Sequence, residues 1–139
     1  MMPDRNRGLV FHGMLLFLLG LLVGLVEEKF ANPRMGLAAH LEGLMNGTFL
    51  LALGAAWQDE RMSNRSGQIA YSCLLYGSYA NLVVTTLAAI LGTNAMTPLT
   101  GAHQAGERWK EFIVTAGFVS VGVTMIVGSV IVLQAFRKR

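Results

Sequence analysis

The sequence predicts an all-α integral membrane protein, with residues 1–139 forming a single domain of four transmembrane helices. Two observations predict this fold class. First, 53 % of the 139 residues are hydrophobic, 14 % are charged and the mean hydropathy is +0.50, whereas about a quarter of an ordinary soluble chain is charged. Second, all charged residues except Glu42 fall in five short clusters, which leave four apolar segments between them. Each segment is close to the roughly 20 residues with which a helix crosses the hydrocarbon core.

This pattern excludes several classes of protein. A water-soluble globule, a disordered chain and a nucleic-acid-binding protein do not fit the apolar composition, although the pI is 9.4. An outer-membrane barrel needs short stretches of alternating polarity, whereas these segments are continuously apolar. The one cysteine, Cys73, excludes an intramolecular disulfide and cysteine-ligated zinc or iron–sulfur sites.

The four helices are expected at about 8–26, 35–57, 69–92 and 112–136. The first segment follows Arg5 and Arg7, as a signal peptide would, but no small-residue cleavage site comes after it. We therefore expect a retained helix. Trp57 and Trp109 flank expected spans and are interpreted as anchors at the membrane surface.

Four spans place both termini on the same side of the membrane. That side carries seven of the Lys and Arg residues, and the opposite side carries four. The positive-inside rule therefore predicts that both termini are cytoplasmic. The seven are Arg5, Arg7, Arg61, Arg65, Arg137, Lys138 and Arg139, and the four are Lys29, Arg34, Arg108 and Lys110.

Two pairs of glycines follow a four-residue spacing. Gly20 and Gly24 lie in the first expected helix, and Gly43 and Gly47 lie in the second. Such pairs let helix backbones approach closely. The approach can occur between subunits or within one chain, and the spacing does not choose between them. Because four helices of this size enclose no large cavity, a sizeable cofactor would lie between subunits, which favours a homo-oligomer.

The second expected helix carries the densest polar set within a span: His40, Glu42, Asn46 and Thr48. A buried ionisable group in a bilayer is costly and needs a partner. Glu42 and Asn46 are four residues apart and share one face of the helix. His40 and Asn46 differ by about 120° and about 9 Å of rise, so one helix does not easily aim both at the same atom from one side. Both could contact a flat cofactor between two subunits, His40 from one chain and Asn46 from its neighbour.

A lone histidine in a membrane helix fits an axial haem ligand better than zinc, because zinc needs at least three protein ligands. The alternative is that His40 hydrogen-bonds a backbone carbonyl or Glu42, and that Glu42 lies near the membrane surface. A bis-histidine haem needs two imidazoles at similar depth. His12 is expected near the inner face, His40 near the outer face and His103 in a loop. A single protein ligand leaves an open iron position, which favours chemistry at the iron over electron transfer.

Residues 39–47 read Ala-His-Leu-Glu-Gly-Leu-Met-Asn-Gly, after His12-Gly13 and a leucine-rich run and before Tyr79-Ala80-Asn81. This combination resembles the hydroxylaminobenzene mutase family and is similar, more distantly, to styrene oxide isomerase. The resemblance covers nearly the whole chain, with matching helix number and loop order. Its motif, a histidine followed six positions later by Asn-Gly, is short, and the flanking matches reinforce it.

The resemblance implies an integral membrane isomerase of the bacterial inner membrane, a homotrimer with haem b between adjacent subunits. His40 would be the axial ligand of the haem iron, and Asn46 would lie beside the substrate. His12 and Asn81 are further candidates for cofactor binding. Where the isomerase has a catalytic tyrosine this chain has Thr85, whose hydroxyl is shorter and much less acidic. That departure weakens the styrene oxide assignment, and Glu42 is a second departure, toward the mutases.

The resemblance thus implies conversion of arylhydroxylamines such as hydroxylaminobenzene to 2-aminophenols, with haem iron as the Lewis acid. Asn46 would orient the departing oxygen or nitrogen, and Glu42 would handle the proton lost from the ring carbon. Thr85, with Asn81 and Tyr79, would line the pocket or bond neighbouring helices. Two alternatives remain open: an isomerase of epoxides to aldehydes, and a non-catalytic membrane subunit for transport or electron transfer.

Overall fold

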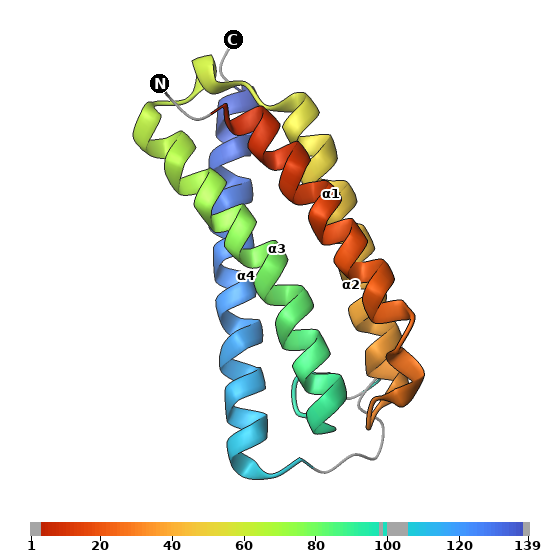
Figure 1. Cartoon of the computed structure of the whole chain (residues 1–139). Coiled ribbons are helices and arrows are strands. Elements are labelled where there is room, and N and C mark those ends of the chain that lie inside the picture. Colours follow the sequence, from red (N-terminus) through yellow and green to blue (C-terminus); the bar gives the residue numbers. More distant parts are fainter. Residues whose placement is uncertain (1–3, 98, 100–105, 138–139) are drawn as a thin grey trace.

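The protein folds into four antiparallel helices (Figure 1). The computed structural model describes residues 4–97, 99 and 106–137, in which all regular structure is helical. The long helices are α1 (Arg5–Gly24), α2 (Pro33–Ala56), α3 (Asn64–Leu91) and α4 (Arg108–Arg137), and two short 3-10 turns follow α1 and α2: η1 (Glu27–Lys29) and η2 (Asp59–Arg61). The start of α1 and the end of α4 lie at the same end of the bundle (Figure 1). His103 lies outside the described residues.

Each of the first three helices begins at a side-chain cap. The carboxylate of Asp4 accepts from the backbone N–H of Arg7, the side chain of Asn32 from that of Met35, and the hydroxyl of Ser63 from that of Ser66. These caps satisfy N–H groups that the helix itself leaves unpaired. The predicted helix starts were late by two to five residues, since the expected starts were 8, 35, 69 and 112. The error arose because capped polar residues begin the helix before the apolar segment does.

Three helices, α1, α3 and α4, are long and apolar enough to cross a membrane. The described part of α2 does not reach the same hydropathy although it has 24 residues, because His40, Glu42 and Asn46 interrupt its apolar sequence. In Figure 1, α2 runs beside α1 over most of its length. The existence of four helices is confirmed, and the fourth membrane crossing stays a prediction.

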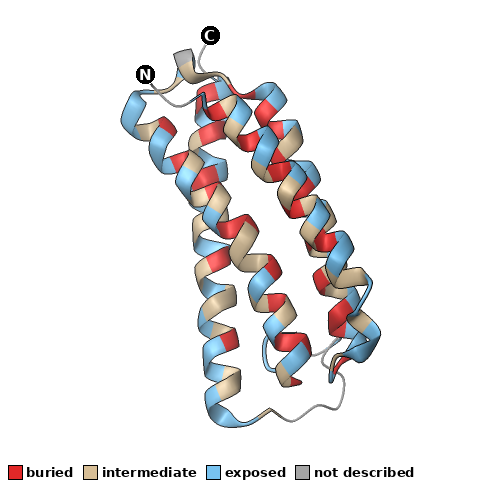
Figure 2. Cartoon of the chain, viewed as in Figure 1, coloured by how far each residue is buried: buried red, intermediate tan, exposed pale blue. Residues whose placement is uncertain are grey.

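Buried residues gather where the helices face one another, whereas residues on the outer faces of the helices are largely exposed (Figure 2). The main core joins residues of all four helices, including Leu16, Leu50, Leu74 and Val132. Large apolar side chains nevertheless lie outside, for example Leu25, which is 78 % exposed, and Phe112, which is 74 % exposed. An apolar exterior of this extent is typical of a surface that meets lipid or another protein rather than water.

The glycine pairs bring α1 and α2 together within one chain. A Cβ atom added to Gly20 would lie 2.8 Å from the Cα of Gly43, and one added to Gly13 would lie 2.8 Å from the carbonyl oxygen of Gly47. Side chains therefore have no room at these crossings. Of the two interpretations of the glycine spacing, the structure bears out packing within the chain. The homotrimer stays a prediction that these glycines do not support.

We expect a side chain at the Gly43 crossing to destabilise the bundle strongly. Gly43→Val forces α1 and α2 apart, and overpacking of this kind costs about 1–3 kcal/mol or more. The measurement is thermal unfolding of the purified protein in detergent, followed by circular dichroism. Gly122→Val is the matched control, because nothing lies within 4 Å of a Cβ at Gly122. Equal unfolding temperatures for the two variants would contradict the close crossing.

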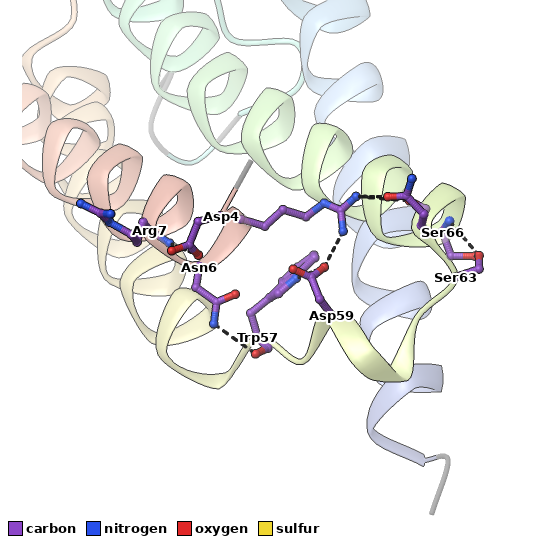
Figure 3. A network of polar contacts seen from close by, with 9 residues as sticks. Asp4, Asn6, Arg7, Trp57, Asp59, Ser63 and Ser66 are labelled. Carbon is purple, nitrogen blue, oxygen red and sulfur yellow. Dashed lines mark hydrogen bonds and ion pairs between the residues drawn. The ribbon is translucent and has the colours of Figure 1, made fainter. Parts of the chain in front are cut away.

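A buried arginine, Arg5, ties the start of α1 to the connection between α2 and α3. Figure 3 shows this region, with Trp57 and Asp59 labelled. Arg5 is 6 % exposed, and its guanidinium donates to the Asp59 carboxylate at 2.5 Å and to the side-chain oxygen of Asn64 at 2.7 Å. The indole N–H of Trp57 donates to the same carboxylate at 2.9 Å. Trp57 is only 5 % exposed. The interpretation of Trp57 as an anchor at the membrane surface was therefore wrong, since its ring packs inside the bundle against Tyr71.

We expect Arg5→Met to lower the free energy of unfolding by about 2 kcal/mol, because it removes hydrogen bonds of a charged group while keeping an apolar stem. Chemical unfolding in mixed detergent measures the effect. Arg7→Met is the control, because Arg7 is exposed. A loss of the same size in both variants would mean that the Arg5 contacts contribute nothing specific.

Candidate functional site

His40 lies in the second turn of α2 and contacts the end of α1. Its Nδ1 lies 2.8 Å from the carbonyl oxygen of Gly20. A carbonyl can only accept, so Nδ1 carries the proton, and in the neutral imidazole Nε2 keeps a free electron pair. Nε2 has no hydrogen-bond partner among the residues that the structure describes. The carbonyl bond expected as an alternative to metal binding is therefore present, and it leaves the other nitrogen able to act as a ligand.

Glu42 lies between α2 and α3 and is held by two amides. Its Oε2 accepts from Nδ2 of Asn46 at 3.1 Å and from Nδ2 of Asn81 at 2.5 Å. Asn46 is four residues further along the same helix, as the spacing predicted, and Asn81 comes from α3. Asn46 is 8 % exposed, and Glu42 and Asn81 are half-buried. The carboxylate is thus fixed through one oxygen, while Oε1 has no hydrogen-bond partner in the described part of the chain.

Thr85 stands behind Asn81 and does not contact Glu42. Its hydroxyl lies 3.5 Å from Oδ1 of Asn81, one turn earlier on α3, and the residue is 2 % exposed. A hydroxyl that donates to Oδ1 directs the Nδ2 group of the same amide toward Glu42. Thr85 therefore acts on the carboxylate through Asn81.

His12 pairs with Tyr79 at a separate place between α1 and α3. The Tyr79 hydroxyl lies 3.0 Å from Nδ1 of His12, and the two rings meet edge to face. His40 contacts α1 at Gly20 and Gly24, so along α1 it lies about 12–18 Å from His12 at 1.5 Å per residue. This separation agrees with the expectation that the two imidazoles lie at different depths.

The structure therefore divides the expected site residues into three places. Glu42, Asn46, Asn81 and Thr85 form one connected group, which we call the carboxylate group. His40 faces α1, and His12 bonds Tyr79. Sequence reasoning did not foresee that Asn81 bonds Glu42 or that the Gly20 carbonyl fixes His40. The available signal was the resemblance at Tyr79-Ala80-Asn81, which does not say which helix Asn81 faces.

An apolar groove of about 490 Å³ lies between α1 and α3. Leu82 and Val83, which follow Asn81 directly, form part of its wall, and Leu19 and Val23 of α1 form the opposite side. Leu82 also lies 3.4 Å from the position of a Cβ on Gly43, the neighbour of Glu42. The described residues contain no group of three or more His, Cys, Asp or Glu side chains that could hold a metal ion.

Comparisons with known proteins identify the family of the chain. The family model described as styrene oxide isomerase matches residues 5–137. The chain belongs to the styrene oxide isomerase family. It is 37 % identical over 133 residues to hydroxylaminobenzene mutase HabB of Ectopseudomonas oleovorans. That alignment covers 95 % of this chain and 81 % of the mutase. It is 35 % identical over 122 residues to hydroxylaminobenzene mutase HabA of the same organism, covering 87 % of this chain and 90 % of that protein. No solved structure matches.

Membership of the styrene oxide isomerase family identifies the chain as an isomerase, and its apolar helices identify it as a membrane protein. The resemblance to both mutase and isomerase, stated from the sequence, is confirmed. The alternative of a non-catalytic membrane subunit is set aside by the same finding.

Proposed function

We propose that the protein converts arylhydroxylamines of the hydroxylaminobenzene type to 2-aminophenols. The observation that carries the proposal is the 37 % identity to a hydroxylaminobenzene mutase over 95 % of the chain. In this isomerisation the oxygen moves from nitrogen to the ortho carbon, that carbon loses a proton, and the nitrogen gains one. Atoms and electrons therefore balance within one molecule, and no reductant is needed.

Haem b is the proposed cofactor, and Nε2 of His40 would hold its iron. The residue fits this role because metal-bound histidines commonly donate their second ring N–H to a backbone carbonyl, as Nδ1 of His40 does to Gly20. A porphyrin supplies its own nitrogen ligands, so a single protein ligand suffices. When bound, the iron supplies a Lewis acid that weakens the N–O bond without net redox change.

Glu42 is the proposed general base. Oε1 takes the proton from the ortho carbon and returns it to the nitrogen, a role in which a positioned carboxylate contributes about 10²–10⁴ in rate. The amides of Asn46 and Asn81 hold Oε2, so the carboxylate keeps one orientation during the transfer. Oδ1 of Asn46 has no hydrogen-bond partner among the described residues, and it accepts from the substrate's N–H or O–H and orients that end.

The apolar groove between α1 and α3 is the proposed place of the aromatic ring. Its described lining is almost wholly aliphatic or aromatic, with Thr86 as the polar exception. The hydroxyl of Thr86 donates to the backbone carbonyl of Leu82 and is not free for a ligand. An apolar surrounding excludes water, and so suppresses its attack at the para carbon of the activated ring.

The proposed assembly is a homotrimer in the bacterial inner membrane, with α2 as a fourth span and both termini in the cytoplasm. The orientation is supported by seven basic residues on the side of the termini against four on the other. Association is supported by the apolar side chains exposed on α1, among them Phe11 at 64 % and Met14 at 55 %. The lipid bilayer and a second copy of the chain both match such a surface.

The family name itself supports a second candidate, isomerisation of an epoxide to an aldehyde.

A parallel assay tests the two candidates. The purified protein in detergent, with no reductant, is given hydroxylaminobenzene and styrene oxide in separate reactions. We expect 2-aminophenol, with a kcat/KM at least about tenfold above that for the epoxide, because Glu42 serves proton transfer from the ring. Faster conversion of styrene oxide to its aldehyde would favour the second candidate. Turnover of neither substrate would contradict both.

A further inference from the structure

The ring of His40 lies directly against Gly24, the last residue of α1. A Cβ atom on Gly24 would lie 2.5 Å from Nδ1, 2.9 Å from Cε1 and 3.1 Å from Cγ of that ring. Cβ atoms in proteins essentially never approach other atoms as closely as the first two distances, so a methyl group at this position needs the ring to move. The missing side chain of Gly24 is what allows His40 its present position.

The two helices are in close backbone contact beside this position. Three residues after His40, Gly43 meets Gly20 with no room for a side chain on either. The carbonyl that accepts from Nδ1 of His40 belongs to the same Gly20. Helix spacing and ring position are thus set by the same short segment, and a displaced ring loses its hydrogen bond.

We propose that Gly24 is a positioning residue for His40. Because Gly24 has no side chain, the imidazole has room to lie where Nδ1–H donates to the Gly20 carbonyl. Nε2 is then left as the ligand nitrogen. This rests on the proposed function in one respect, namely that the ligand held by Nε2 is haem iron. The glycine spacing on α1 therefore serves the metal ligand as well as helix packing.

The tautomer of His40 tests this positioning by Gly24 without any cofactor. The full chain is labelled with ¹⁵N-histidine, purified without added haem and studied by NMR, with His40→Ala to assign the signal. We expect the Nδ1–H tautomer in the wild type and in Gly24→Ala a shift toward the Nε2–H tautomer. Gly122→Ala is the matched control and should leave the signal unchanged, because that position is open. A wild-type His40 in the Nε2–H form, or no change in Gly24→Ala, would overturn the proposal.

Haem binding is the second measurement. Titration of the same proteins with hemin, followed through the Soret band, should give at least tenfold weaker binding for Gly24→Ala than for Gly122→Ala. Equal hemin affinity in both variants would overturn the claim that Gly24 positions His40 for haem binding. If the tautomer changes as expected but the wild type binds no hemin, the positioning of His40 by Gly24 is supported and the haem part of the proposed function fails.

A double variant covers the case in which Gly24→Ala unfolds. With His40→Ala the ring is gone, and a methyl at position 24 no longer meets Nδ1 or Cε1. His40→Ala with Gly24→Ala should then unfold at the same temperature as His40→Ala alone, because only contacting residues are coupled. A further loss of stability in the double variant would show that the methyl clashes with something other than the ring, and would contradict the proposal.

Discussion

Replacing His40 by alanine is expected to abolish the Soret band of the purified protein and to lower kcat/KM by about three orders of magnitude or more, because the Lewis acid is lost with its ligand. The fold should survive, since among the described residues the ring makes a single hydrogen bond, to the Gly20 carbonyl. Absorbance spectra and turnover of hydroxylaminobenzene measure the two effects. We expect this loss to be the largest for any single substitution in the site, because it removes the cofactor outright.

The matched control for this experiment is Thr48→Ala on the same helix. Within the described part of the chain its hydroxyl donates to the Leu44 carbonyl alone, and the residue is exposed. A second arm uses His40→Gly with added imidazole, which should restore part of the Soret band, because the vacated space admits a free ligand. Full haem content and full activity in His40→Ala would exclude His40 as the iron ligand.

Glu42→Gln is expected to lower kcat by about 10²–10⁴, the usual contribution of a general base, while haem content stays unchanged. Glutamine keeps the length and shape of the side chain but cannot take the proton of the ring carbon. Steady-state kinetics with hydroxylaminobenzene and the Soret absorbance measure the two quantities separately. A lower kcat with unchanged haem content indicates a residue that carries the proton. A lower kcat together with lower haem content indicates a residue that supports the haem.

The control is Glu28→Gln, an exposed carboxylate in η1. An Asn81→Ala variant should show a smaller loss of kcat than Glu42→Gln, because it removes one of the two hydrogen bonds to Oε2 and leaves the base in place. Unchanged kcat in Glu42→Gln would leave the carboxylate a structural role between α2 and α3 and would remove it from the mechanism.

The number and order of the helices could be predicted because every charged residue except Glu42 lies in a loop or near the end of a helix. Their starts could not, because capping by Asp4, Asn32 or Ser63 decides where a helix begins, and apolar composition does not report it. Trp57 was misplaced for a related reason. A tryptophan at the end of an apolar run can face lipid or the interior, and the contact with Asp59 that draws it inward depends on the fold.

The candidate site was predictable on one helix and not across helices. Spacing placed Glu42 and Asn46 on the same face of α2, and the structure joins them. The partner that α3 supplies, Asn81, and the carbonyl that α1 supplies, Gly20, depend on which faces meet. Periodicity gives the face of a residue but not its neighbour in another helix. The same limit left the glycine pairs open between packing within the chain and packing between subunits.

The central claim is that this isomerase moves oxygen from nitrogen to carbon within one arylhydroxylamine molecule. Its most direct measurement uses hydroxylaminobenzene labelled with ¹⁸O on nitrogen, the purified wild-type protein and no reductant, with mass spectrometry of the product. We predict 2-aminophenol that retains the ¹⁸O label. Oxygen from water in the product, or no aminophenol at all, would contradict the claim.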